Sequence, residues 1–228
     1  MNGFWSQVKS FDQQITLALN GGHSEYWNSV MSTLTSKYVW IPILLTIVYV
    51  LYKNNERRNF LLIILSVILC VTFADQISSS IFKPLFQRFR PSHDPILKYQ
   101  IELVNNYRGG RYGFISSHAA NCFSIATFLM LLFRNKIMTI VLAFWAVLIC
   151  YTRIYMGVHF LGDILAGALT GAIIGFVIYR CYSRILLKCP VFRNESLVGQ
   201  GKITYKYLFL IYIMLGVTYS FIFVKAFF

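Results

Sequence analysis

Long apolar runs alternate with short polar segments along most of the chain. Six of these runs are candidates to cross a membrane: residues 38–52, 59–82, 114–133, 137–156, 161–180 and 205–226. A helix needs about 20 apolar residues to cross the bilayer, and the first run is the shortest of the six. The pattern predicts an all-α, polytopic membrane bundle of about six transmembrane helices.

The segment before the first run has a different pattern. It places apolar side chains at helical spacing between polar ones, at Phe4, Val8, Phe11, Ile15 and Leu19. An amphipathic helix of this kind lies in the plane of the membrane surface, with its apolar face in the lipid. We therefore predict an N-terminal interfacial helix beside the bundle.

The composition agrees with a membrane protein. Of the 228 residues, 57% are hydrophobic and 13% are charged, which is unlike a soluble globular chain. No internal repeat or long linker divides the sequence, so residues 1–228 are expected to form one membrane domain. The five cysteines lack metal-ligand spacing and are expected to pack as small apolar residues.

Three clusters of polar residues interrupt the apolar pattern, and the first covers residues 75–91. Lys83 and Arg90 are seven residues apart, so a continuous helix would put both cations on one face and make an anion clamp. Alternatively, both mark an ordinary membrane boundary, where basic side chains reach for lipid headgroups. Asp75 favours the first reading, because a carboxylate inside a span is costly unless it is paired. We expect Asp75 to orient Lys83.

The second cluster opens the run 114–133. Ser116 and Ser117 stand at the expected start of a helix, where unpaired backbone N–H groups and the helix dipole favour an anion. His118 follows directly. The alternative is a serine helix cap followed by an interfacial histidine without a chemical role.

The third cluster lies between the runs 137–156 and 161–180. His159 and Asp163 are four residues apart, so on a helix they would share a face, and the carboxylate could fix the tautomer of the imidazole. Arg153, six residues before His159, would point roughly 240 degrees away on the same helix. We therefore predict a turn at Gly157, with Arg153 closing one span and His159 and Asp163 opening the next.

Together the three clusters resemble the three-part signature of the type-2 phosphatidic acid phosphatase superfamily. In the first part, six residues separate Lys83 from Arg90-Pro91. The second part is Ser116-Ser117-His118. In the third part, five residues separate Arg153 from His159, and three separate His159 from Asp163. Members include integral-membrane lipid phosphatases, with glucose-6-phosphatase, bacterial acid phosphatases and vanadium haloperoxidases as relatives. The motif-bearing core is about 39–180, and 205–226 is an additional C-terminal transmembrane helix. The chain departs from the family pattern at Ser117, where the family usually has glycine.

The resemblance implies a mechanism. His159 would be the nucleophile, forming a phosphohistidine, with Asp163 holding its imidazole, and His118 would protonate the leaving oxygen and then activate water. The phosphate oxygens would be bound by Lys83, Arg90, Arg153, the Ser116 hydroxyl and the Ser117 N–H. No metal and no cofactor is expected.

A lipid whose phosphate lies at headgroup depth is the expected substrate. The candidates are undecaprenyl diphosphate, phosphatidylglycerol phosphate, phosphatidic acid and the phosphates of lipid A, with the 92–113 loop as selector. Arg108 and Arg111 would contact a second phosphate or a large headgroup; alternatively, they belong to a flexible basic loop near anionic lipid. A transporter or a non-catalytic lipid-binding protein is the rival reading. A transporter would have polar residues near the middle of its spans, whereas here, apart from Asp75, they gather at one membrane boundary.

The net charge of +13 does not indicate a nucleic-acid partner, because the basic residues are spread over short loops between the runs. Basic residues gather in cytoplasmic loops, and the two sides hold nearly equal numbers. With Lys83, Arg90 and Arg153 set aside as functional, the count favours a cytoplasmic position for the opposite side. We therefore expect a bacterial inner-membrane protein with its active site on the periplasmic side.

Overall fold

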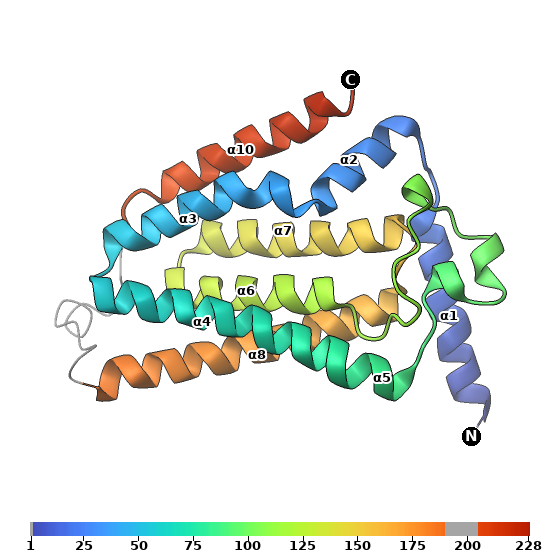
Figure 1. Cartoon of the computed structure of the whole chain (residues 1–228), viewed down its shortest axis with the longest axis horizontal. Helices are drawn as coiled ribbons and strands as arrows, with labels where there is room; N and C mark the ends of the chain where they lie inside the picture. Colours follow the sequence, from blue (N-terminus) through green and yellow to red (C-terminus); the bar gives the residue numbers. More distant parts are fainter. Residues whose placement is uncertain (1, 190–204) are drawn as a thin grey trace.

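The structure is a computed structural model, and it describes residues 2–189 and 205–228. Within these residues it consists of helices and contains no strand. The helices are α1 (Asn2–Asn20), α2 (Glu25–Thr35), α3 (Ile41–Asn54), α4 (Arg57–Gln76), α5 (Lys83–Phe86), α6 (Ser117–Phe133), α7 (Lys136–Tyr155), α8 (Leu161–Lys188) and α10 (Leu208–Lys225). Figure 1 shows α3, α4, α6, α7, α8 and α10 running side by side, so the predicted all-α class is confirmed.

Each of the six predicted apolar runs forms a helix, but they differ in length. Arg57–Phe86, Lys136–Tyr155, Leu161–Lys188 and Leu208–Lys225 are each long and apolar enough to cross a membrane. A fifth span is possible if α2 joins with residues 37–54 across a bend of 61°. The remaining helix, α6, has 17 residues, which is short for a full crossing of about 30 Å.

The bend before α3 explains why the first run was the shortest. The run predicted at 38–52 forms η1 (Lys37–Trp40) and α3, and α2 precedes it at an angle. The sequence pattern did not predict α2. Its N-terminus is capped by Ser24, whose hydroxyl accepts a hydrogen bond from the Trp27 N–H at 3.2 Å.

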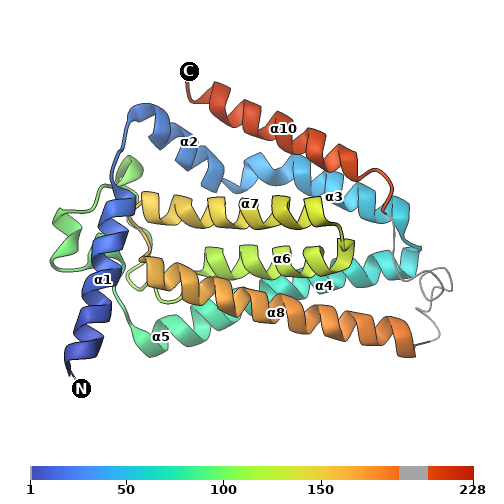
Figure 2. The same ribbon diagram turned by 180° about the vertical axis from the view of Figure 1, so that it is seen from behind.

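Helices α6 and α8 pack closely through glycine. Gly167, Gly171 and Gly175 follow at four-residue intervals on one face of α8, and a Cβ at any of them would collide with a backbone carbonyl of α6. Small residues at this spacing let membrane helices approach backbone to backbone. Figure 2 shows α6 between α7 and α8, so the centre of the bundle is built on this contact.

Large apolar side chains are exposed along the outside of the bundle. Leu44, Leu65, Ile140, Leu169 and Phe221 are each more than half exposed, on five different helices. Such a surface suits contact with lipid rather than water. Arg193 and Lys202, two of the basic residues counted above for the side opposite the site, lie outside the described residues.

Helix α1 lies across one end of the bundle (Figures 1 and 2). It exposes Phe4, Trp5 and Phe11, as the predicted interfacial helix would. At its C-terminal end, the Asn20 side-chain amide donates to the carbonyl oxygens of Ile154 at 3.2 Å and Tyr155 at 2.7 Å. These carbonyls lie in the last turn of α7, where carbonyl groups lack the usual helical partners, although the Ile154 carbonyl also accepts a hydrogen bond from the Gly157 N–H at 2.9 Å. The helix is therefore joined to the end of α7 by direct hydrogen bonds.

Candidate active site

The three polar clusters meet at the end of the bundle that α1 covers. The Lys83 ammonium donates to the Ser117 hydroxyl, which joins the first cluster to the second. The Ser116 N–H donates to the Asp163 carbonyl oxygen at 3.0 Å, which joins the second to the third. Arg90 Nη1 lies 2.8 Å from His159 Nε2, which joins the third to the first. Residues up to 80 positions apart in the sequence therefore form one site.

Lys83 and Arg90 reach this site by a different route from the one predicted. A π-helical segment, Ile77–Phe82, leads into the short helix α5, which ends at Phe86, and Gln87 adopts the left-handed conformation with φ 43°. Arg90 then lies on extended backbone before Pro91. The prediction that a continuous helix places both cations on one face is wrong, because the helix stops four residues before Arg90.

Asp75 reaches Lys83 through a serine rather than by direct contact. The Ser79 hydroxyl lies 3.5 Å from Asp75 Oδ1, and it accepts a hydrogen bond from Lys83 Nζ at 3.3 Å. Because α4 continues into the π-helical segment, Asp75, Ser79 and Lys83 follow one another along the same side of it. Asp75 therefore contacts Lys83 only indirectly, through the Ser79 hydroxyl.

Arg90 and Arg153 are buried cations without a carboxylate partner in the described part of the chain. Their exposed fractions are 9% and 3%. Arg90 Nη1 donates to the Val158 carbonyl, and Arg153 Nη1 donates to the Thr35 hydroxyl at 2.8 Å, while the Nε atom of each guanidinium has no hydrogen-bond partner. Burial, together with the positive charge of Arg153, lowers the pKa of Arg90. Two buried guanidinium groups with free donors form a site for an anion.

His159 lies in the turn between α7 and α8, on the path predicted for it. Helix α7 ends at Tyr155, Gly157 has φ +69°, and α8 begins at Leu161. At Gly157 a side chain would meet the Glu102 carbonyl oxygen at 2.8 Å, so only glycine fits. His159 itself precedes the helix, so the prediction that it shares a helix face with Asp163 is wrong. Their proximity comes from the turn.

The contacts of His159 define its tautomer. Arginine only donates hydrogen bonds, so Nε2, 2.8 Å from Arg90 Nη1, is the acceptor and carries no proton. The other nitrogen, Nδ1, lies 3.5 Å from Asp163 Oδ2. That distance is long for a hydrogen bond, and the backbone of Gly113 also interacts with the imidazole. Burial, followed by the charges of Arg90, Arg153 and Lys83, lowers the pKa of His159 well below its ordinary value of 6.5.

Asp163 is fully buried in the first turn of α8. Its Oδ2 accepts a hydrogen bond from the Phe160 N–H at 3.1 Å, which caps the helix. Its Oδ1 accepts a second from Arg88 Nη1 at 2.9 Å. The carboxylate is therefore held at both oxygens while one edge faces the imidazole of His159.

The start of α6 supplies the remaining groups. The Ser116 hydroxyl is buried and accepts a hydrogen bond from the Ala119 N–H at 3.4 Å, as a helix cap does. Ser117 begins the helix, and its hydroxyl contacts Ser78 Oγ at 2.9 Å besides Lys83. His118 follows on the first turn, and its residue is exposed. Burial of its imidazole, followed by the positive charge of Arg153, lowers the pKa of His118. The Ser116 hydroxyl acts as a helix cap, which is the alternative that the sequence left open for it.

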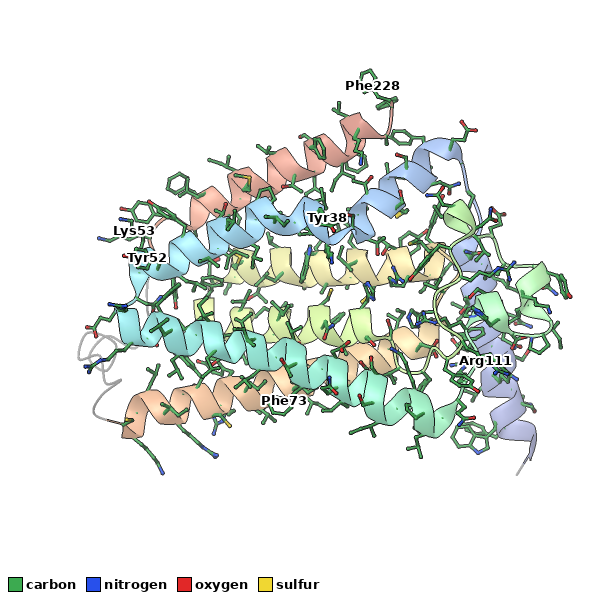
Figure 3. The ribbon with its side chains drawn as sticks, in the orientation of Figure 1. Tyr38, Tyr52, Lys53, Phe73, Arg111 and Phe228 are labelled. Atoms are coloured by element: carbon green, nitrogen blue, oxygen red, sulfur yellow. The ribbon has the colours of Figure 1, made fainter. Side chains whose placement is uncertain are left out.

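The two loop arginines hydrogen-bond to or stack on residues other than His118 and His159. Arg108 Nη1 donates to the Ser92 carbonyl at 3.1 Å. Arg111 stacks on the rings of Phe89 and Tyr112 at 5.1 and 5.6 Å, and Figure 3 shows it at the end of the molecule that α1 covers. Both are exposed, so they rim the site rather than form it.

Sequence reasoning missed two residues of this site, Arg88 and Asp12. Arg88 Nη2 lies 2.6 Å from Asp12 Oδ2, and Nη1 contacts Asp163. No local spacing connects Asp12 with Arg88, because α1 meets the site only in the folded chain. The one available signal was an arginine two positions before Arg90. Among the described residues, no group of three or more His, Cys, Asp or Glu side chains could hold a metal ion.

Comparison with known proteins gives a consistent result. The family model described as the PAP2 superfamily matches residues 59–186, which include all three clusters. A lipid A 4'-phosphatase of Bacteroides thetaiotaomicron is 41% identical over 75% of this chain and 77% of its own length. A lipid A 4'-phosphatase of Porphyromonas gingivalis is 38% identical over 85% of this chain and 84% of its own.

Two solved structures share the fold. A PAP2-type phosphatidylglycerolphosphate phosphatase from Bacillus subtilis matches with a TM-score of 0.59 and 24% identity, over 78% of this chain and 88% of that one. LpxE from Aquifex aeolicus matches with a TM-score of 0.54 and 25% identity, over 73% and 93%. The motifs, the geometry of the site and these matches lead to one conclusion: the chain belongs to the PAP2 superfamily, and it is a membrane phosphatase.

Proposed function

We propose that this chain removes a phosphate from lipid A by way of a phosphohistidine on His159, without a metal ion. The observation that carries the mechanism is the unprotonated Nε2 of His159, 2.8 Å from the buried guanidinium of Arg90. The lone pair of Nε2 accepts a hydrogen bond from Arg90 in the free protein. When a phosphate arrives, Arg90 would turn this donor to a phosphate oxygen and leave the Nε2 lone pair free to attack phosphorus.

The first step forms a bond from His159 Nε2 to phosphorus and breaks the bond from phosphorus to the lipid oxygen. His118 donates a proton to that leaving oxygen. For this step the negative charge of the phosphate must first raise the pKa of His118, which burial and the charge of Arg153 lower to about 3 in the free protein. The charge that develops on the phosphate oxygens is stabilised by Arg90, Arg153 and Lys83. As Nε2 bonds to phosphorus, the imidazole becomes positive, and Asp163 at Nδ1 stabilises it.

The second step releases the phosphate. His118, having lost its proton, takes one from a water molecule, which attacks phosphorus and breaks the bond to Nε2. Inorganic phosphate leaves, and His159 returns to its neutral form. His118 is exposed on the first turn of α6, so it can exchange protons with solvent between the two steps.

Lipid A is favoured as substrate by the relatives. Two of them, at 41% and 38% identity over most of their lengths, are named lipid A 4'-phosphatases. Undecaprenyl diphosphate is the second candidate, because an undecaprenyl-diphosphatase of Sulfolobus acidocaldarius is 28% identical over 73% of this chain. The exposed Arg108 and Arg111 at the rim are the residues we propose to contact a second phosphate of either lipid.

The proposal includes a position in the cell. We propose the inner membrane of a bacterium, with the site facing the periplasm. The supports are the apolar surface of the bundle, the charge count of the sequence, and the site's location at one end of the helices. A phosphatase there would act on lipids whose headgroups reach that leaflet.

A substrate panel tests the proposal. Purified protein in detergent is given hexa-acylated diphosphoryl lipid A, undecaprenyl diphosphate, phosphatidylglycerol phosphate and phosphatidic acid, with and without EDTA. We expect the fastest phosphate release from lipid A, loss of the 4'-phosphate by mass spectrometry, and no effect of EDTA. Preference for another of the four lipids by tenfold or more would refute the substrate, and loss of activity in EDTA would refute metal independence.

A further inference from the structure

Arg88 is held by two carboxylates from opposite sides. Its Nη1 lies 2.9 Å from Asp163 Oδ1, and its Nη2 lies 2.6 Å from Asp12 Oδ2. The plane of the guanidinium lies over the Phe160 ring, 4.1 Å from its centre. Both terminal nitrogens are therefore engaged, and Arg88, unlike Arg90 and Arg153, has no free end to offer a phosphate.

The contact with Arg88 sets the rotation of the Asp163 carboxylate. Asp163 is fully buried, so no water competes for its oxygens. Arg88 holds Oδ1, and Oδ2 is left to the Phe160 N–H at 3.1 Å and to Nδ1 of His159 at 3.5 Å. Without Arg88, the carboxylate would be an uncompensated buried charge, free to rotate away from the imidazole or to take up a proton.

Asp12 in turn holds Arg88, and it comes from α1. Besides its ion pair, Asp12 accepts a hydrogen bond from the Gly162 N–H at 2.8 Å, and the Thr16 hydroxyl accepts one from the Leu161 N–H at 3.1 Å. A side chain at Gly162 would meet Asp12 Oδ2 at 2.8 Å. Helix α1 thus lies directly on the first turn of α8, the turn that carries Asp163.

We infer that Arg88 is a positioning residue for the phosphatase reaction, that Asp12 supports it, and that α1 is therefore part of the active site. Arg88 acts through Asp163 on the orientation of His159. This inference rests on the proposed role of His159 as nucleophile. A misplacement of a nucleophile by about 1 Å costs on the order of a hundredfold in rate, and this sets the size of the expected effect.

The test compares Arg88→Met, Asp163→Asn and the double variant, with Lys9→Met on the exposed side of α1 as the matched control. We expect kcat of Arg88→Met to fall about a hundredfold with KM within about threefold of wild type. Because Arg88 acts through Asp163, the double variant should be no slower than Asp163→Asn alone. Arg88→Lys should recover about tenfold, since it restores one charged contact.

Two results would overturn the inference: kcat of Arg88→Met within about threefold of wild type, or losses that multiply in the double variant, which would mean that Arg88 acts independently of Asp163. If Arg88→Met does not fold, Asp12→Asn replaces it. That change keeps an oxygen for the Gly162 N–H and removes the charge beside Arg88, so kcat should fall about tenfold, and unchanged kcat would refute the inference. His159→Ala in parallel tests the proposed function by itself, because its loss of activity is expected whatever Arg88 does.

Discussion

His159 lies among three cations, and that surrounding fixes its charge before substrate arrives. Burial and the charges of Arg90, Arg153 and Lys83 lower its pKa well below 6.5. A histidine with a lowered pKa stays neutral as the pH falls through 6.5 and is protonated only at much lower pH. The free enzyme therefore holds a neutral nucleophile across the physiological range.

This leads to a prediction for histidine NMR. In protein with isotope-labelled histidine, the His159 signals, identified by their loss in His159→Gln, should show a neutral ring with its proton on Nδ1 from about pH 8 to about pH 5.5. The reason is the donor Arg90 at Nε2, which leaves Nδ1 to carry the proton. A titration midpoint between pH 6 and 7 for these signals would contradict the electrostatics described here.

Ser117 is one of the residues at which the chain departs from the usual family pattern, and its contacts suggest what the hydroxyl does. Its hydroxyl contacts Lys83, Ser78 and Ser79, so it fixes the end of the lysine side chain. We predict that Ser117→Gly, the usual family residue, lowers kcat about tenfold, equivalent to about 1.4 kcal/mol, because Lys83 loses a fixed partner. Steady-state kinetics against Ser183→Ala, a serine far along α8, would measure it. A Ser117→Gly enzyme as fast as wild type would show that the hydroxyl has no part in holding Lys83.

The motif residues could be found from the sequence because their spacing is local, and the contacts between clusters could not. Lys83, Arg90, His118, Arg153, His159 and Asp163 were each identified from short stretches, and the structure brings them together. Arg88 and Asp12 are 76 positions apart and meet only through the packing of α1 on α8. Such a pair leaves no periodic pattern, so sequence reasoning has no means to detect it.

At the scale of elements, the glycine face of α8 positions the two halves of the site. It holds α8, which carries Asp163, against α6, which carries His118. The continuous apolar runs predicted both helices well, because lipid-facing and core-facing residues of a membrane helix are both apolar. It did not predict α2, the π-helical segment, or the end of the helix at Phe86, because these breaks depend on packing at the end of the bundle.

The glycine face can be tested with a matched pair of variants. Gly171 lies against the backbone of Ala120, whereas Gly216 on α10 has nothing within 4 Å of an added Cβ. We predict that Gly171→Ala lowers stability by about 1–3 kcal/mol through overpacking and lowers activity with it, and that Gly216→Ala does neither. Thermal unfolding and phosphate release in detergent would measure both. Equal melting temperatures for the two variants would contradict a close α6–α8 contact.

At the scale of the whole molecule, the charged groups of the site gather at one end of an apolar bundle. The tight turns at Asn54–Arg57 and Phe133–Lys136 lie at the opposite end, which Figure 3 marks by Lys53. A transporter would place charged residues near the middle of the spans, and among the charged side chains that the structure describes only Asp75 approaches that position. The arrangement suits an enzyme that receives a phosphate group at the membrane surface.

The covalent bond that we propose between His159 and phosphorus can be tested by removing the imidazole. Phosphate release from lipid A should be followed for wild type and His159→Ala, with equal membrane insertion and matching thermal unfolding as the check on folding. We predict that His159→Ala releases no phosphate above background, because the variant lacks the nitrogen that bonds to phosphorus in the proposed mechanism. Phosphate release by a folded His159→Ala protein at a rate close to that of wild type would contradict the account.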